Sequence, residues 1–189
     1  MDVHIAIEKR RSVRRFKERR VPREDLERLV DYARLAPSGM NKQPLEYVIV
    51  DDPELEREFF DYTSWAGSVA WSPGKAERPK AYIVILYNTN VEPVTEREDS
   101  GLAAENVMLG AVEAGLGSCP LGALEEDEIR ELLSIPDDRS VCFAIGLGYP
   151  DGSIELEDGE SETDYWLDDD EVLHVPKKPR EAILHVNGW

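Results

Sequence analysis

AYIVILY, residues 81–87, is a run of seven uncharged residues in a chain in which 33% of the residues are charged. Its β-branched and aromatic side chains favour a strand, and its unbroken hydrophobicity favours one that is covered on both faces. Two further apolar runs, residues 45–50 and 141–148, also predict strands. We therefore expect a β-sheet in which residues 81–87 form the most deeply buried strand.

Helical spacing of apolar residues and local capping residues predict helices in the rest of the chain. The predicted helices cover residues 3–10, run from Pro22 to Ala36, begin at Asp52-Pro53, begin at Asp99 or Ser100, and cover residues 125–134. Residues 115–122 contain three glycines and are predicted to form a loop. Because helices and strands do not alternate regularly, we expect an α+β fold rather than a doubly wound parallel sheet.

The composition is that of an acidic globular protein. The chain has 189 residues, of which 41% are hydrophobic, and its 22 basic and 40 acidic residues give a net charge of −18. A charge of this sign argues against binding nucleic acid or an anionic membrane over a broad surface. No apolar run has the length of about 20 residues that a membrane span needs, and the charged N-terminus lacks a secretion signal. We expect a soluble, cytoplasmic protein with a single domain over residues 1–189.

The two cysteines, Cys119 and Cys142, indicate neither a disulfide framework nor a metal site. Neither has a CxxC partner or a nearby histidine, so we expect no bound metal. Cys119 precedes a proline in an apolar segment, where a buried small residue is favoured over a redox thiol. Cys142 lies in a predicted apolar strand and is expected in the core.

Positive charge is concentrated in two short segments of this acidic chain. RRSVRRF, residues 10–16, holds four arginines and a serine, and KKPR, residues 177–180, lies near the C-terminus. Arg10 and Arg14 would share a face if the first segment were helical. Arginine and serine beside a helix end are suited to holding a phosphate group, with ordinary surface residues as the alternative reading.

Two stretches between these segments have residues suited to a flat ligand. APSGMNKQP, residues 36–44, offers the side-chain amides of Asn41 and Gln43, which can pair with the edge of a heteroaromatic ring. GLGSCPLGAL, residues 115–124, has three glycines that let backbone N–H groups approach a ligand closely. Each stretch alone is weak evidence, and Asn41 could simply end a turn.

Taken in order along the chain, these segments resemble the nitroreductase family of FMN-dependent oxidoreductases, almost from end to end. The motifs that carry the resemblance are Ile7-Glu8-x-Arg10-Arg11-Ser12-x-Arg14-x-Phe16, Ala36-Pro37-Ser38-Gly39-x-Asn41-x-Gln43-Pro44, Glu105-Asn106-x-Met108-Leu109, Gly115-Leu116-Gly117-Ser118-Cys119, Gly146-x-Gly148-Tyr149-Pro150 and Lys178-Pro179-x-Glu181. The resemblance implies an α+β fold with a mixed central sheet flanked by helices. It also implies an intertwined homodimer with two FMN molecules at the dimer interface.

The resemblance further implies which residues bind FMN. Arg10, Ser12 and Arg14 would hold the phosphate and the ribityl chain, and Asn41 would meet the edge of the flavin ring. The full set of expected cofactor-binding residues is Arg10, Arg11, Ser12, Arg14, Pro37, Ser38, Asn41, Gln43, Pro120, Leu121, Gly122, Lys178 and Arg180. Pro120, Leu121 and Gly122 would approach the ring chiefly through their backbone.

The implied activity is the transfer of electrons from NADH or NADPH to a nitroaromatic, quinone or similar small oxidant. Donor and oxidant would use the same face of the flavin in turn, which predicts ping-pong kinetics. No side chain is expected as a catalytic acid or base, because flavin N5 carries the chemistry. Trp65 or Trp71 could line the substrate side. The alternatives are another reaction on the same scaffold, such as flavin destruction or dehalogenation, and a non-catalytic flavin carrier or sensor.

The last part of the chain differs from what precedes it. Residues 151–176 contain 11 acidic residues and no lysine or arginine, and we expect a solvated excursion there. Residues 177–189 begin with the second basic segment and end in the apolar run AILHVNGW. The resemblance assigns this tail to wrapping around the partner subunit.

Overall fold

The computed structural model describes residues 1–65, 72–92, 95–159 and 163–189. The chain divides into two compact units, of which the first contains residues 1–65 and 73–151 and the second is built mainly from residues 152–189. The boundary falls at the start of the acidic segment. A single domain over residues 1–189 stays a prediction.

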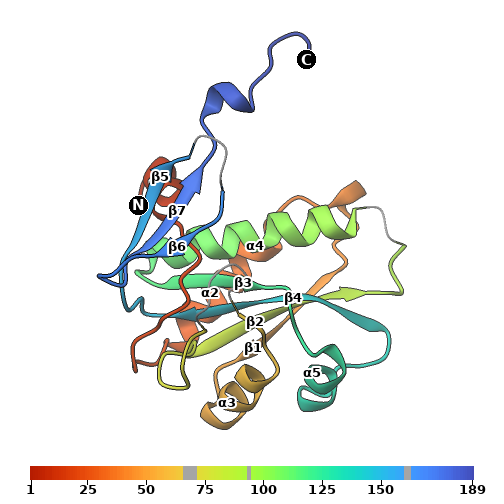
Figure 1. Cartoon of the computed structure of the whole chain (residues 1–189). Coiled ribbons are helices and arrows are strands. Elements are labelled where there is room, and N and C mark those ends of the chain that lie inside the picture. Colours follow the sequence, from red (N-terminus) through yellow and green to blue (C-terminus); the bar gives the residue numbers. More distant parts are fainter. Residues whose placement is uncertain (66–71, 93–94, 160–162) are drawn as a thin grey trace. The chain divides into compact units, whose positions relative to one another are not determined.

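A four-stranded sheet forms the centre of the first unit (Figure 1). Its strands lie in the order β1 (Leu45–Val50), β2 (Ala81–Asn88), β4 (Arg139–Gly148) and β3 (Gly117–Leu121). Every neighbouring pair is antiparallel. The run AYIVILY lies in the interior strand β2, where all seven of its residues are buried, so the strand prediction is confirmed.

Helices cover both faces of this sheet (Figure 1). The helices are α2 (Arg23–Arg34) and α4 (Glu96–Glu113) on one face, α3 (Pro53–Asp61) and α5 (Glu126–Leu132) on the other, and the short α1 (Val3–Lys9), which packs against α4. Along β2, Ile83 and Ile85 enter the core under α2 and α4. Tyr82 and Val84 enter the core under α3 and α5. Because both faces are buried, the strand is hydrophobic from Ala81 to Tyr87, and the α+β class is confirmed.

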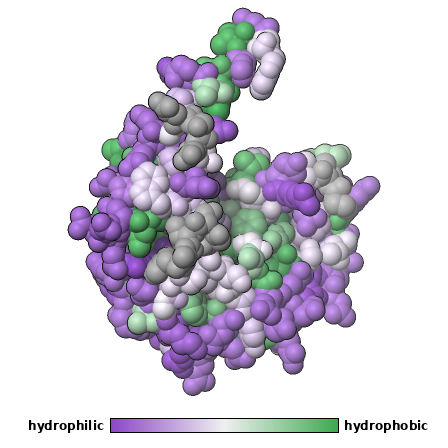
Figure 2. Space-filling model, viewed as in Figure 1, coloured by the Kyte–Doolittle hydropathy of each residue, from purple (hydrophilic) through white to green (hydrophobic). Residues whose placement is uncertain are grey.

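Hydrophilic residues dominate the face of the molecule in Figure 2, with smaller groups of hydrophobic residues between them. This surface agrees with the net charge of −18. None of the helices in the described part of the chain is long and apolar enough to cross a membrane.

Two predictions of local structure were wrong, one on where a helix begins and one on a loop. Helix α4 begins at Glu96 rather than at Asp99 or Ser100, which are both buried within the helix. The helical spacing of apolar residues in α4 starts only at Leu102. A prediction from this spacing therefore did not include the acidic first turn. Strand β3 lies inside the loop that was predicted over residues 115–122. Glycine and proline usually interrupt strands, but β3 is an edge strand, where Pro120 is tolerated.

The segment of residues 10–16, called here the N-terminal arm, is extended and runs beside the edge strand β3. Ser12 makes a parallel bridge with Ser118, and the Val13 N–H donates to the Ser118 carbonyl oxygen at 2.9 Å. Gly117 permits this approach, because a Cβ on it would lie 2.8 Å from Val13 Cβ. The arm is thus docked on β3 by backbone contacts that a larger side chain would block.

The second unit contains a three-stranded sheet where a solvated excursion was expected. Its order is β5 (Ile154–Asp158), β7 (Leu173–Lys177) and β6 (Trp166–Leu167), and the short 3₁₀ helix η2 (Arg180–Ala182) follows. β5 is parallel to β7, and β6 is antiparallel to β7. Apolar and acidic residues alternate from Ile154 to Glu157 along β5, although Leu156 is 45% exposed. Residues 160–162 of the expected excursion lie outside the described residues.

His174 links the strands of this small sheet through both ring nitrogens. Nδ1 lies 2.5 Å from Glu157 Oε1, and Nε2 lies 3.1 Å from Asp168 Oδ2. The ring stacks on Trp166, with the ring centroids 4.9 Å apart. The hydrogen bonds to Asp168 and Glu157 raise the pKa of His174 above its ordinary value of 6.5. Only the protonated ring can donate to both carboxylates at once.

We predict that Gly117→Ala destabilises the protein by about 1–3 kcal/mol, because the added methyl group overpacks against Val13. Gly101→Ala is the matched control, since nothing lies within 4 Å of a Cβ there and alanine is favoured inside a helix. Urea unfolding followed by circular dichroism measures both variants. An unchanged free energy of unfolding for Gly117→Ala would contradict the tight docking of the arm.

We also predict that His174→Gln loses stability at low pH and little at high pH. A raised folded-state pKa gives a stabilisation that is complete below 6.5 and disappears as the pH rises through the folded value. Urea unfolding between pH 5 and 9 of this variant, wild type and His4→Gln measures the difference. A stability gap that widens with rising pH would show that the sign is wrong.

Candidate functional site

The N-terminal arm concentrates positive charge at the edge of the central sheet. Arg10, Arg11 and Arg14 are all partly buried on extended backbone, so the helical face considered for Arg10 and Arg14 does not form. Arg10 Nε lies 3.4 Å from Glu105 Oε1, which partly compensates one charge. Burial, and then the neighbouring charge of Arg10, lower the pKa of Arg11. A bound anion would relieve this repulsion.

A small cavity opens beside the arm. It has a volume of about 200 Å³, and Lys9, Arg11, Gly117 and Ser118 are among the residues that line it. None of the described residues lining it is acidic. Two cations and small residues with accessible backbone are a donor set suited to an anion.

Cys119 is buried, and Cys142 is partly buried against the core. Cys119 exposes 2% of its surface, and burial raises its pKa to about 11, although the charge of Arg14 acts in the opposite direction. Burial likewise raises the pKa of Cys142 to about 12. Both side chains therefore stay protonated at neutral pH, as expected of structural cysteines rather than redox thiols. Among the described residues, no group of three or more His, Cys, Asp and Glu side chains could hold a metal ion.

The loop of residues 36–44 has an unusual backbone. Three of its non-glycine residues have positive φ angles, namely Met40 (51°), Asn41 (54°) and Gln43 (49°). Such angles cost free energy, so the surrounding contacts must hold the loop. The Gln43 N–H donates to Ser38 Oγ at 3.0 Å. Asn41 and Gln43 are exposed, and their amides are accessible to a ligand. Pro37, Ser38 and Gln43 help to line a cavity of about 160 Å³.

Asp99 accepts a hydrogen bond from the backbone of this loop. This role was not predicted from the sequence. Asp99 Oδ1 accepts hydrogen bonds from the Gly39 N–H at 3.0 Å and from the Thr95 hydroxyl at 2.7 Å. Asp99 stands four residues before Ala103 and eight before Val107, which are both fully buried. This helical spacing was the available signal for a buried carboxylate.

The end of β3 carries the third group of predicted residues. Leu121 is buried in the core under α3 and α5, so its side chain is not available to a ligand. Pro120 and Gly122 are exposed. Exposed Pro120 and Gly122 beside a buried Leu121 are compatible with backbone contacts to a ligand. Such contacts stay a prediction.

The central sheet separates the arm from the loop of residues 36–44. β3 and β1 are its two edges, three strand intervals apart. Ser118, beside the arm, pairs with Leu147 on β4, and Leu147 pairs in turn with Ala81 at the start of β2. Leu45, which follows the loop, lies level with Tyr87 at the other end of β2. Intervals of about 4.8 Å and six residues of about 3.4 Å place these two corners roughly 25 Å apart. The arm and the loop therefore leave the sheet at opposite corners, although both reach α4, the arm at Glu105 and the loop at Asp99.

The remaining predicted residues belong to other parts of the chain. Lys178 and Arg180 follow β7 in the second unit, and their contribution to a site with the arm stays a prediction. Trp65 is half-buried, and its Nε1 donates to Thr63 Oγ1 at 2.7 Å. Trp71 lies outside the described residues.

Comparison with known proteins identifies the family of this chain. A family model described as "Nitroreductase family" matches residues 7–149. An iodotyrosine deiodinase of Thermotoga neapolitana is 31% identical over 162 residues, covering 76% of this chain and 86% of the relative. An NADPH-flavin oxidoreductase of Vibrio harveyi is 27% identical over 191 residues, covering 95% of this chain and 71% of the relative.

A solved structure extends the likeness to the whole chain. The FMN-dependent nitroreductase of Clostridium difficile R20291 superposes with a TM-score of 0.69 at 26% identity. The match covers 97% of this chain and 98% of that one. The motifs in the arm and the loop fall inside the matched region, and the α+β architecture is shared. The chain therefore belongs to the nitroreductase family.

Proposed function

We propose that this protein is an FMN-dependent oxidoreductase that acts as a homodimer. It would transfer electrons from NADH or NADPH to a nitroaromatic, a quinone or a similar small acceptor. The observation that carries the proposal is the arm, which holds arginines and a serine at a sheet edge in a chain of net charge −18. The relatives named as an NADPH-flavin oxidoreductase and an FMN-dependent nitroreductase support the cofactor and the donor.

The arm fits the phosphate end of FMN. Arg11 sits in a local positive field, and the docking on β3 holds Ser12 beside it. Guanidinium groups pair with phosphate oxygens in two parallel hydrogen bonds, and a serine hydroxyl can add a third donor. Enclosure by several cations favours a terminal phosphate monoester, so we expect FMN to bind better than FAD.

The loop of residues 36–44 would meet the ring end, and we propose that it serves the FMN held by the arm of a second chain. The corners of the sheet from which the two groups extend lie roughly 25 Å apart, a separation that favours a site shared between two chains. Asn41 and Gln43 would therefore meet the flavin that is held by the arm of a second chain. A composite site of this kind requires the dimer.

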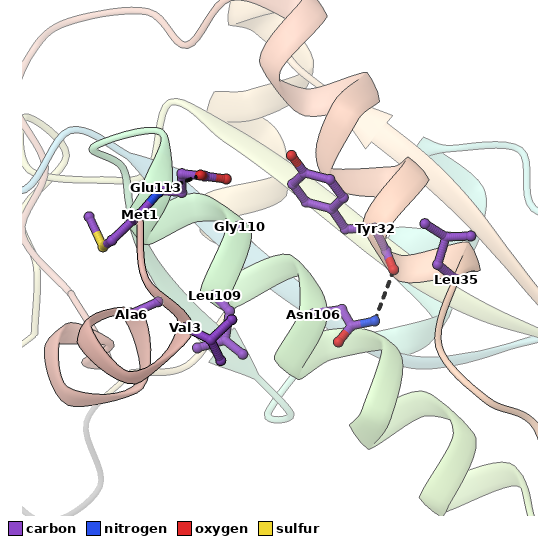
Figure 3. A pocket seen from close by; sticks show the side chains of 9 residues that line it. All are labelled: Met1, Val3, Ala6, Tyr32, Leu35, Asn106, Leu109, Gly110 and Glu113. Atoms are coloured by element: carbon purple, nitrogen blue, oxygen red, sulfur yellow. Dashed lines mark hydrogen bonds and ion pairs between the residues drawn. The ribbon is translucent and has the colours of Figure 1, made fainter.

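The first unit has an apolar surface suited to such a dimer. Val3 and Leu35 expose 67% and 66% of their surface, although both are hydrophobic. Together with Leu109 they border a groove of about 260 Å³ between α1, α2 and α4 (Figure 3). Contiguous exposed hydrophobic side chains mark interaction surfaces. We assign the groove to the dimer contact, together with the apolar tail of residues 182–189.

The chain's own residues would bind and orient the cofactor rather than react. Bound FMN would supply hydride transfer at N5. Arg10, Ser12 and Arg14 would fix the phosphate end, while the loop amides of the second chain would fix the ring edge. The two protonated thiols take no part. One open ring face serving donor and acceptor in turn predicts ping-pong kinetics.

We predict that Arg14→Ala weakens FMN binding about 10- to 100-fold, because a charge-assisted phosphate contact contributes about 1.5–3 kcal/mol. The control is Arg57→Ala, which removes an exposed arginine from α3 and should have little effect. Titration of FMN fluorescence measures both affinities, and gel filtration of the wild type tests retention of FMN. Equal affinities for the two variants would refute the role of the arm. Wild-type protein that elutes without FMN would refute the whole assignment.

Reductive dehalogenation is the second candidate, because the deiodinase of Thermotoga neapolitana is 31% identical to this chain. This reaction replaces the ring-bound iodine by hydrogen with two electrons and one proton, and releases iodide. An assay of the FMN-loaded protein with 3-iodotyrosine and with a nitroaromatic compound separates the candidates. Release of iodide without oxidation of NAD(P)H by the nitroaromatic compound favours the second.

A further inference from the structure

Asp99 is a buried carboxylate that the binding scheme does not yet use. It exposes 4% of its surface, and its second oxygen, Oδ2, lies 3.3 Å from the Gly39 nitrogen. A carboxylate is costly to bury unless it accepts hydrogen bonds, and those to Gly39 and Thr95 meet this need. Asp99 also lies in the first turn of α4, where the aligned peptide dipoles favour negative charge. The carboxylate is therefore a firm attachment point for the Gly39 backbone.

The loop that leaves Gly39 depends on such an attachment. The Asn41 N–H donates to the Ser38 carbonyl at 2.9 Å, and the Lys42 N–H donates to the Gly39 carbonyl at 3.1 Å. Gly39 is thus both the residue held by Asp99 and the start of the turn. The strained residues follow directly, and their backbone persists only where the surroundings hold it.

The far end of the loop is held separately. The Asn88 N–H at the end of β2 donates to the Pro44 carbonyl at 2.9 Å. Asn41 and Gln43 lie between these two attachments, with exposed side chains. Release of the Gly39 end would leave the Pro44 end in place and would shift both amides relative to the rest of the fold.

We propose that Asp99 is a positioning residue for the flavin ring, an inference that rests on the proposed function. By fixing Gly39 to the start of α4, Asp99 sets where Asn41 and Gln43 meet the ring edge of the FMN held by the second chain. In this role Asp99 acts through the loop backbone, by its hydrogen bond from the Gly39 N–H. The buried carboxylate thereby gives α4 a part in cofactor binding besides its packing in the core.

The test compares three single variants in the full-length protein. Asp99→Ala removes both acceptor oxygens, Asp99→Asn keeps the size of the side chain and one acceptor, and Glu98→Gln removes an exposed charge from the same turn. The dissociation constant for FMN should rise about tenfold for Asp99→Ala, less for Asp99→Asn, and remain unchanged for Glu98→Gln. The visible circular dichroism of bound FMN should change in the Asp99 variants, because the contacts at the ring edge move.

The same substitution in a chain that already carries Asn41→Ala and Gln43→Ala separates positioning from general destabilisation. If Asp99 acts through these amides, Asp99→Ala changes the FMN affinity of that chain by less than about twofold. A full tenfold loss in that background would overturn the inference. If Asp99→Ala fails to fold, Asp99→Asn carries the same comparison.

Failure of this inference is distinguishable from failure of the proposed function. Wild-type protein that does not bind FMN would refute the proposed function. Wild-type protein that binds FMN, together with an Asp99→Ala variant of unchanged affinity and unchanged flavin spectrum, would refute only the role of Asp99.

Discussion

The central sheet keeps the basic arm and the amide-bearing loop apart, and the account of the site depends on this separation. Each group is fixed to an element of the fold by backbone contacts. The arm is docked on β3 through Ser12 and Ser118, and the loop is tied to α4 through Asp99. In the proposed function, the residues for the phosphate end and those for the ring end extend from opposite corners of one sheet, and two chains would share each cofactor.

The exposed apolar side chains near α1 and α4 are consistent with a site shared between two chains. Helix α4 buries residues on several sides, including Ala104 and Met108 as well as Val107, which is typical of a helix that must be covered all round. The sheet and α2 cover part of it, whereas Leu102 remains 47% exposed. A second chain over α1 and α4 would cover the remaining apolar surface and would bring the two halves of the site together. Dimer formation and cofactor binding would then be coupled.

Several parts of the fold could be read from local sequence because local interactions determine them. The run at residues 81–87 is apolar at every position, since both faces of β2 are covered. Asp52 followed by Pro53 marks the start of α3, where the Asp52 side chain accepts from the Glu54 and Leu55 N–H groups. The candidate site was predicted from motifs that resemble a family, and the arm is placed where a phosphate site is feasible.

Other parts depend on tertiary contacts that no local pattern reveals. The arm is extended because Gly117 allows Val13 to approach β3, a contact between residues more than a hundred positions apart. Strand β3 forms in spite of its glycine and proline because β4 offers it a pairing edge. In the acidic segment β5 pairs with β7 although β6 lies between them in the sequence, and His174 joins the sheet through Glu157 on β5 and Asp168 after β6. Asp99 is recognisable as an anchor only when Gly39 is seen beside it.

Complementation between two defective chains tests the shared site most directly. One chain carries Arg14→Ala, the other carries Asn41→Ala and Gln43→Ala, and the heterodimer is purified with two different affinity tags and titrated with FMN. The account predicts that one of the two sites in the heterodimer combines an intact arm with an intact loop and binds FMN with wild-type affinity, while both variant homodimers bind weakly. If arm and loop act within the same chain, every site in the heterodimer carries one defect, and the absence of any wild-type site would contradict the account.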